Sequence, residues 1–196
     1  HKGTGKLTVE TSLNYGFPLP SIYEAFNARV ESNFQNLWNE KLEEKEIDID
    51  IESLSNTIYF ARLATMAQGL LFIEHISSIE NLEIDLKEVL QNWSAGCIIR
   101  SDLLKELGDL NLSNALTSSE FVQNTLLENL ESIKKVIKTC VDGSVSIPVI
   151  TSSYNWFVGT TNSFNPSSLI QAQRDYFGAH QVQLNNSDEF IHLDWD

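Results

Sequence analysis

The chain has 196 residues and a formal net charge of −14 at pH 7. Hydrophobic residues make up 42% of it and charged residues 20%, which is typical of a folded chain with a hydrophobic core and not of a disordered one. Its length fits one domain or slightly more. So acidic a chain does not suit non-specific binding to nucleic acid or anionic membranes, because both need positive charge facing phosphate. A local anion-binding site is still compatible with this charge.

The chain begins with the glycine-rich stretch HKGTGK, which has the composition of a functional turn. It is not a dinucleotide-binding fingerprint, which would need a glycine in place of Thr8, and it is not a P-loop, because Leu7 stands where a P-loop has Ser or Thr. No other glycine-rich turn follows a predicted strand. We therefore expect no nucleotide-binding domain in this chain, although Lys2 and Thr4 place a cation and a hydroxyl beside flexible backbone.

Apolar side chains at three- and four-residue spacings predict long helices in the first half of the chain. The expected helices cover residues 19–45, after the turn GFPLP; residues 51–77, with Ser53 or Ser55 near the start; and residues 85–99, capped by Asp85. The second of them is apolar on almost every side. Because polar and charged residues interrupt its apolar run, we expect the central helix of a bundle and not a membrane span.

The second half continues with helices and ends differently. We expect helices over residues 118–139, from Pro148 to Val158, and after Pro166, a residue favoured in the first turn. The tail QVQLNNSDEFIHLDW alternates apolar and polar residues around a turn-prone NNSD, which predicts a hairpin or an extended arm. The expected fold class is all-α, a multi-helix domain with long helices (1–180) and a short extended or β-like C-terminal tail (181–196).

Residues that could bind a metal or form disulfides are few. Two cysteines, Cys97 and Cys140, are too few for a disulfide scaffold and are expected to be reduced and at least half-buried. The histidines show no zinc-binding spacing; they are His1, His75, His180 and His192. The amino-terminal residues lack the apolar stretch of a signal peptide, so we expect a cytoplasmic protein.

Arginines are the more selective candidates for binding an anion, because the guanidinium fork fits phosphate or carboxylate. Arg29 follows the apolar stretch EAFNA, and Arg174 lies in LIQAQRDYFGAH, six positions before His180. On an unbroken helix Arg174 and His180 would diverge, but a helix end at Gly178 would let them face the same way. From the pattern alone, an intramolecular salt bridge is the more ordinary explanation of either arginine.

The motifs resemble a known family when they are taken together. LIQAQRDYFGAH is similar to a signature near the C-terminus of 6-phosphogluconate dehydrogenases. KGTGKLT, LNYGFPLPSIYEAFNAR, WSAGCIIRSDLL, IPVITSSYNWFVG and FIHLDW resemble further stretches of that family, in its order and at about its spacing. The resemblance covers essentially the whole chain.

The resemblance implies the C-terminal helical domain and tail of a decarboxylating dehydrogenase of the pentose phosphate pathway. Such an enzyme oxidises 6-phosphogluconate to ribulose 5-phosphate with NADP, without a metal. The resemblance places the NADP-binding domain, the catalytic lysine and the catalytic glutamate upstream of His1, so this chain alone is expected to be inactive. The alternative is a non-catalytic helical dimerisation or interaction module derived from that family.

The resemblance also assigns substrate contacts to five residues of this chain. They are Lys2, Thr4, Arg29, Arg174 and His180. In the family, the arginine and histidine of the tail signature are supplied to the neighbouring subunit of a homodimer. We therefore expect 6-phosphogluconate and a second copy of the chain as partners.

Overall fold

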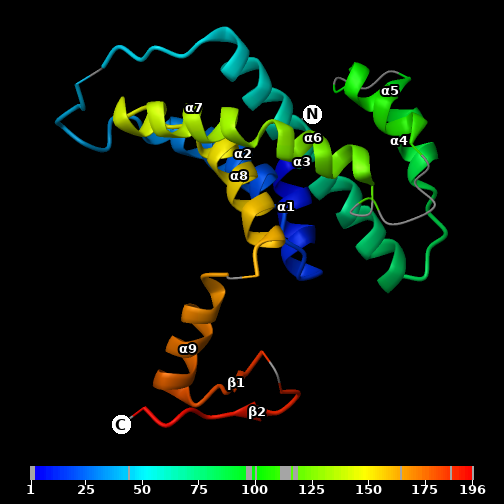
Figure 1. Cartoon of the computed structure of the whole chain (residues 1–196), viewed down its shortest axis with the longest axis vertical. Helices are drawn as coiled ribbons and strands as arrows, with labels where there is room; N and C mark the ends of the chain where they lie inside the picture. Colours follow the sequence, from blue (N-terminus) through cyan, green and yellow to red (C-terminus); the bar gives the residue numbers. More distant parts are fainter. Residues whose placement is uncertain are drawn as a thin grey trace. The chain divides into compact units, whose positions relative to one another are not determined.

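The computed structural model describes residues 3–43, 45–95, 99, 101–110, 116, 119–163, 165–185 and 187–195. Helices dominate this part of the chain, which confirms the expected all-α class (Figure 1). The chain divides into two compact units, His1–Phe157 and Val158–Asp196. This division differs from the expected domain boundary at residue 180, which stays a prediction.

The first unit contains seven of the described helices and the start of an eighth. Their bounds are α1 Thr4–Asn14, α2 Pro20–Glu31 followed by the 3-10 turn η1 Ser32–Phe34, α3 Ile51–Ile79, α4 Leu86–Ser94, α5 Asp102–Asp109, α6 Glu120–Glu128, α7 Leu130–Asp142 and α8 Pro148–Thr161. Helix α8 ends in the second unit, which further contains α9 Ser167–Gly178, β1 Val182–Gln183 and β2 Phe190–Ile191.

Helix α3 is the central element of the first unit, and α4, α6 and α7 all pack against it. It covers the expected range. Asp50 is the cap, and its Oδ1 accepts the backbone N–H of Ser53 at 2.7 Å. Within the described part of the chain, no helix is long and apolar enough to cross a membrane.

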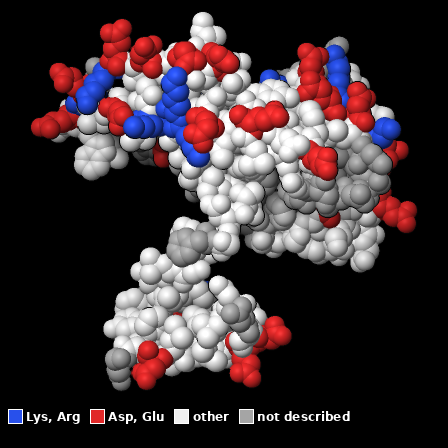
Figure 2. Space-filling model, in the orientation of Figure 1, with Lys and Arg blue, Asp and Glu red and all other residues white. Residues whose placement is uncertain are grey.

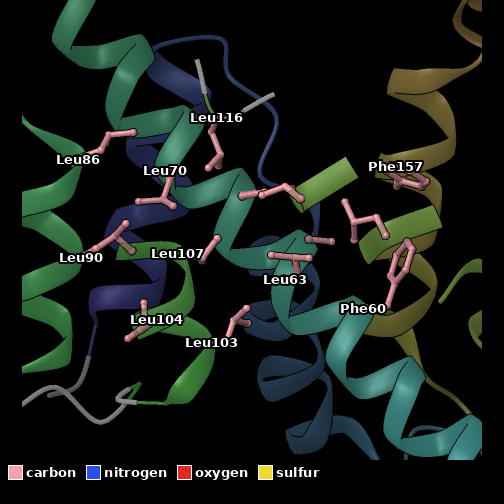
Figure 3. Close-up of a cluster of buried hydrophobic side chains, with 14 of the residues drawn as sticks. Phe60, Leu63, Leu70, Leu86, Leu90, Leu103, Leu104, Leu107, Leu116 and Phe157 are labelled. Atoms are coloured by element: carbon pink, nitrogen blue, oxygen red, sulfur yellow. The ribbon is translucent and has the colours of Figure 1, made fainter. Parts of the chain in front are cut away.

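The core of the first unit consists mainly of leucine side chains (Figure 3). Leu63 and Leu70 of α3 are fully buried and meet a group of leucines from α4 and α5, namely Leu86, Leu90, Leu103, Leu104 and Leu107. At the other side of the cluster, Phe60 meets Phe157 of α8 edge to face, with ring centroids 5.6 Å apart.

A buried chain of hydrogen bonds also joins α2, α3 and α8. The Gln68 amide donates from Nε2 to Ser21 Oγ at 2.8 Å, and its Oε1 accepts the backbone N–H of Ser21 at 3.1 Å. Ser153 Oγ donates to the carbonyl of Val149 at 2.8 Å, so the 2.9 Å contact between the two serine hydroxyls uses the proton of Ser21. Gln68 and both serines are fully buried, and each has hydrogen-bond partners.

Two predicted helices were too long. The helix predicted to reach Lys45 ends at Glu31, where Ser32 Oγ and Asn33 Nδ2 donate to the carbonyls of Arg29 and Val30 at 2.8 and 3.1 Å. The helix predicted over residues 118–139 is two helices, α6 and α7, which meet at Asn129, whose Nδ2 donates to the Thr125 carbonyl at 2.8 Å. In both places a polar side chain bonds to helix carbonyls where the helix ends, and such bonds compete with the backbone bonds of a continued helix.

The other predictions met different outcomes. Asp85 caps α4 as expected, through the N–H of Lys87 at 2.8 Å, but α4 ends at Ser94 and the rest of its predicted range lies partly outside the described residues. Helix α8, helix α9 and the antiparallel hairpin confirm the predictions for the last third. The sequence analysis did not predict helices α1 and α5.

Cys140 is buried, as expected, and Cys97 lies outside the described residues.

Candidate anion-binding site

The first unit has a groove between the start of α1 and one side of α2. Gly3, Thr4, Gly5 and Lys6 line it from α1, and Arg29 lines it from α2. It encloses about 570 Å³, within the range usual for small-molecule sites. Thr4 and Arg29, two of the residues singled out in the sequence, are thus brought together. Lys2, a third, lies outside the described residues.

The amino terminus of α1 gives this groove a positive character. The first N–H groups of a helix have no partner inside it and lie at the positive end of the helix dipole. Gly3 precedes the helix with φ 122°, in the left-handed region that disfavours any residue with a Cβ. The described residues 3–6 are therefore the start of a helix and not a separate turn, and Gly3 allows the backbone to enter that helix.

Arg29 lies in the last turn of α2 with an exposed side chain. Its Nη1 donates to Ser32 Oγ at 2.8 Å. Among the described residues, the ion pairs include neither Arg29 nor Arg174, so the salt-bridge explanation receives no support from the structure. Figure 2 shows acidic side chains gathered mainly along the upper side of the first unit in this view, with Lys and Arg among them.

The second unit has its own groove along α9. Ile170, Gln173, Arg174, Phe177, Gly178 and His180 line it. Arg174 Nη1 donates to Gln171 Oε1 at 3.1 Å, so its hydrogen-bond partner there is a neutral amide. The structure thus confirms that Arg174 and His180 face a common space.

The chain turns back after Gly178, which brings the side chain of His180 to the groove along α9. Helix α9 ends at Gly178, as expected, but the left-handed residue is Ala179, with φ 51°. A Cβ added to Gly178 would lie 2.9 Å from two atoms of the His180 ring. A side chain at position 178 would therefore make the exposed His180 ring shift, while the backbone angle of Gly178 does not itself require glycine.

Sequence reasoning missed Asp175, which is fully buried in the second unit. Its burial raises the pKa, but hydrogen bonds from His192, Leu193, Trp195 and Gln181 outweigh that effect and hold the pKa at about 2. The available signal was its position beside Arg174, together with the donors of the final stretch FIHLDW. In so acidic a chain, one more aspartate did not stand out.

The described residues offer no place for a metal or a dinucleotide. Among them, no group of three His, Cys, Asp or Glu side chains lies close enough together to hold a metal ion. Their β-structure is the two-stranded antiparallel hairpin of the second unit. A dinucleotide site of the usual kind needs a parallel sheet with a glycine-rich turn before a helix, and the described residues do not form a site of that kind.

Comparisons with known proteins agree on one family. The model of the 6-phosphogluconate dehydrogenase C-terminal domain matches residues 1–195. The decarboxylating 6-phosphogluconate dehydrogenase of Lactococcus lactis (strain IL1403) is 32% identical over 212 residues, which cover 100% of this chain and 44% of the relative. The mouse protein of that name is 30% identical over 214 residues, covering 99% of this chain and 43% of the relative.

A solved structure is similar over the whole chain. The Plasmodium falciparum 6-phosphogluconate dehydrogenase, described in its apo form and in complexes with NADP+ and with 6-phosphogluconate, matches with a TM-score of 0.80 and 27% identity. The match covers 100% of this chain and 45% of that one. The chain thus spans less than half the length of these relatives.

Proposed function

The chain belongs to the 6-phosphogluconate dehydrogenase family, whose C-terminal domain it matches over residues 1–195, and we propose that it is the substrate-binding and dimerisation part of such an enzyme. The complete enzyme would oxidise and decarboxylate 6-phosphogluconate to ribulose 5-phosphate with NADP. NADP and the general acid–base pair would be held by a part of the enzyme outside this chain. The role of this chain is then to bind and orient the sugar phosphate.

The groove of α9 supports a phosphate site in the second unit, and this is the observation on which the proposal chiefly rests. Arg174 and His180 line the same groove, and the guanidinium is hydrogen-bonded there to a neutral amide. A guanidinium fits two phosphate oxygens at once, and hydrogen bonds between charged groups are stronger than neutral ones. A phosphate monoester would therefore find a matched donor set in this groove.

The groove between α1 and α2 supports contacts to the rest of the substrate. The hydroxyl of Thr4, the first amides of α1 and the guanidinium of Arg29 all lie along it. Helix amino termini and arginines both favour oxyanions. We assign Lys2, Thr4 and Arg29 to this part of the site.

The exposed apolar surface of the second unit supports a role in dimerisation. Phe177, Leu169 and Tyr176 of α9 are 83%, 67% and 58% exposed. Apolar side chains that gather on one surface are typical of protein interfaces. In the proposed dimer, α9 of one copy contributes Arg174 and His180 to a site that the other copy completes.

The test is Arg174→Ala in the complete dimeric enzyme that contains this chain. Loss of hydrogen bonds to a charged group costs about 1.5–3 kcal/mol, so we expect KM for 6-phosphogluconate to rise about 10- to 150-fold, at about 1.4 kcal/mol per factor of ten. The matched control is Lys138→Ala, which removes an exposed positive charge from α7. An unchanged KM in Arg174→Ala would remove this residue from the site.

The same measurements separate the enzyme from the non-catalytic module. A complete enzyme with this chain should produce NADPH from NADP and 6-phosphogluconate. If the folded dimer binds 6-phosphogluconate and produces no NADPH, the dehydrogenase activity is excluded and the binding module takes its place.

A further inference from the structure

The carboxylate of Asp175 has all of its acceptor positions filled. Its Oδ1 accepts the backbone N–H of Gln181 at 2.7 Å and Nδ1–H of His192 at 3.0 Å. Its Oδ2 accepts the backbone N–H of Leu193 at 2.9 Å and Nε1–H of Trp195 at 3.0 Å. An ionised carboxylate offers about four lone-pair positions, so each oxygen is paired with two donors.

These bonds fix the backbone on both sides of His180. Ala179 and Gln181 have φ 51° and 65°, in the left-handed region where residues other than glycine are strained. The N–H of Ala179 donates to the Asp175 carbonyl at 2.8 Å, and the N–H of Gln181 donates to the Asp175 carboxylate at 2.7 Å. One residue therefore holds the two strained positions that flank the histidine.

A second path joins Asp175 to the guanidinium of Arg174. Arg174 Nη1 donates to Gln171 Oε1 at 3.1 Å, and Gln171 Nε2 donates to the carbonyl of Gln181 at 2.5 Å. Gln181 is the residue whose N–H is bound by the Asp175 carboxylate. The orientations of the arginine and of the histidine thus depend on the same clamped turn.

We propose that Asp175 is a positioning residue that holds Arg174 and His180 in the geometry of the phosphate site. The C-terminal segment His192–Trp195 contributes by donating hydrogen bonds to the Asp175 carboxylate. The proposal rests on the phosphate-binding role proposed above for Arg174 and His180. Asp175 itself is fully buried and is absent from the lining of the groove, so it acts through its neighbours and not on the substrate.

An asparagine at position 175 could not accept all four of the hydrogen bonds that the carboxylate accepts. Whichever way the new amide of Asp175→Asn turns, its NH₂ group faces two donors that had shared an oxygen, and neither donor can bond to it. The substitution keeps the size of the side chain, so it tests the hydrogen bonds and the charge. The matched control is Asp188→Asn, which makes the same change in charge at an exposed position of the hairpin.

The first experiment measures steady-state kinetics of the complete dimeric enzyme. We expect Asp175→Asn to raise KM for 6-phosphogluconate about 10- to 100-fold, the scale of an ångström-sized misplacement of a binding group, while KM for NADP stays unchanged. Trp195→Phe removes one of the donors and keeps a ring against Tyr176, and it should raise the same KM less. Equal KM values for Asp175→Asn, Asp188→Asn and the wild type would overturn the proposal.

A double-mutant cycle then separates positioning from general stability. If Asp175 acts partly through Arg174, Asp175→Asn should raise KM by a smaller factor in an Arg174→Ala background than in the wild type, with the remaining effect acting through His180. Multiplying effects in the double variant would overturn positioning through Arg174. An Arg174→Ala variant with wild-type KM would overturn the phosphate-binding role itself, whereas a raised KM in Arg174→Ala with none in Asp175→Asn would overturn only the role of Asp175.

If Asp175→Asn fails to fold, the same double-mutant cycle can be measured with Arg174→Ala and Trp195→Phe. Its side chain remains aromatic and only the Nε1–H donor is lost. A raised KM for 6-phosphogluconate whose increase is smaller in the Arg174→Ala background supports the proposal, and a KM equal to that of the wild type contradicts the part of it assigned to the C-terminal segment.

Discussion

The first unit is built around apolar side chains, whereas the second is built around a charge. In the first unit, leucines of α3, α4 and α5 pack into one cluster, and its buried polar groups are neutral side chains such as Gln68. In the second unit, the buried residues within the described part are Asp175 and Val182. A cluster of leucines gains stability from burial in any arrangement that packs well, but a buried carboxylate is stable only with its donors in place. The stability of the second unit therefore depends more strictly on the positions of its hydrogen-bonding groups. Such a dependence suits a segment that has to orient side chains.

The largest expected effect on stability is in the leucine cluster. Leu104→Ala removes a fully buried side chain from α5 and should lower the free energy of unfolding by about 2–5 kcal/mol. Leu127→Ala is the control, because that side chain is 56% exposed. Urea denaturation followed by circular dichroism measures both. Equal losses for the two variants would contradict the view that apolar burial stabilises the first unit.

A smaller effect is expected from the buried hydrogen bonds of the same unit. Gln68→Leu keeps a similar volume and leaves the buried N–H of Ser21, near the start of α2, without its acceptor. An unpaired buried donor should lower the free energy of unfolding by about 1–3 kcal/mol. The control is Gln91→Leu at an exposed position of α4. If Gln68→Leu were neutral, the polar chain between α2, α3 and α8 would add nothing to the stability of the apolar core.

Periodicity in the sequence predicted the elements better than their ends. Helix α3 and the tail hairpin follow from the spacing of apolar residues, since each spacing matches the period of the element. The end of α2 and the break between α6 and α7 do not, because the apolar spacing continues through Ser32 and Asn129 while their side chains bond to helix carbonyls. Helix α1 was hidden by the glycines of KGTGK, which are poor helix formers in isolation.

The candidate site was predictable only where local sequence determines it. Gly178 marked the end of α9, which correctly placed Arg174 and His180 on one groove. Asp175 could not be found in this way. Three of the four groups that donate hydrogen bonds to its carboxylate belong to residues 17 to 20 positions later in the sequence. Such a contact depends on the return of the hairpin to α9, which no local spacing reveals.

The smallest expected effect is a difference in acid sensitivity within the second unit. The pKa of Asp175 is held at about 2 in the folded chain, below the usual value of about 3.9. A lowered folded pKa stabilises the fold at pH values above the unfolded pKa, and this contribution is lost as the pH falls from about 4 through 2.

His192 is the titratable side chain bonded to Asp175, and a protonated imidazole still donates from Nδ1. The Trp195 indole N–H signal in NMR spectra should therefore stay in its hydrogen-bonded position down to about pH 4 and shift as Asp175 takes up a proton toward pH 2. In Asp175→Asn, whose amide does not take up a proton in this range, the signal should not change between pH 4 and pH 2. A wild-type signal that moved above pH 5 instead would mean that protonation of the Asp175 carboxylate does not control the contact of the C-terminal segment with α9.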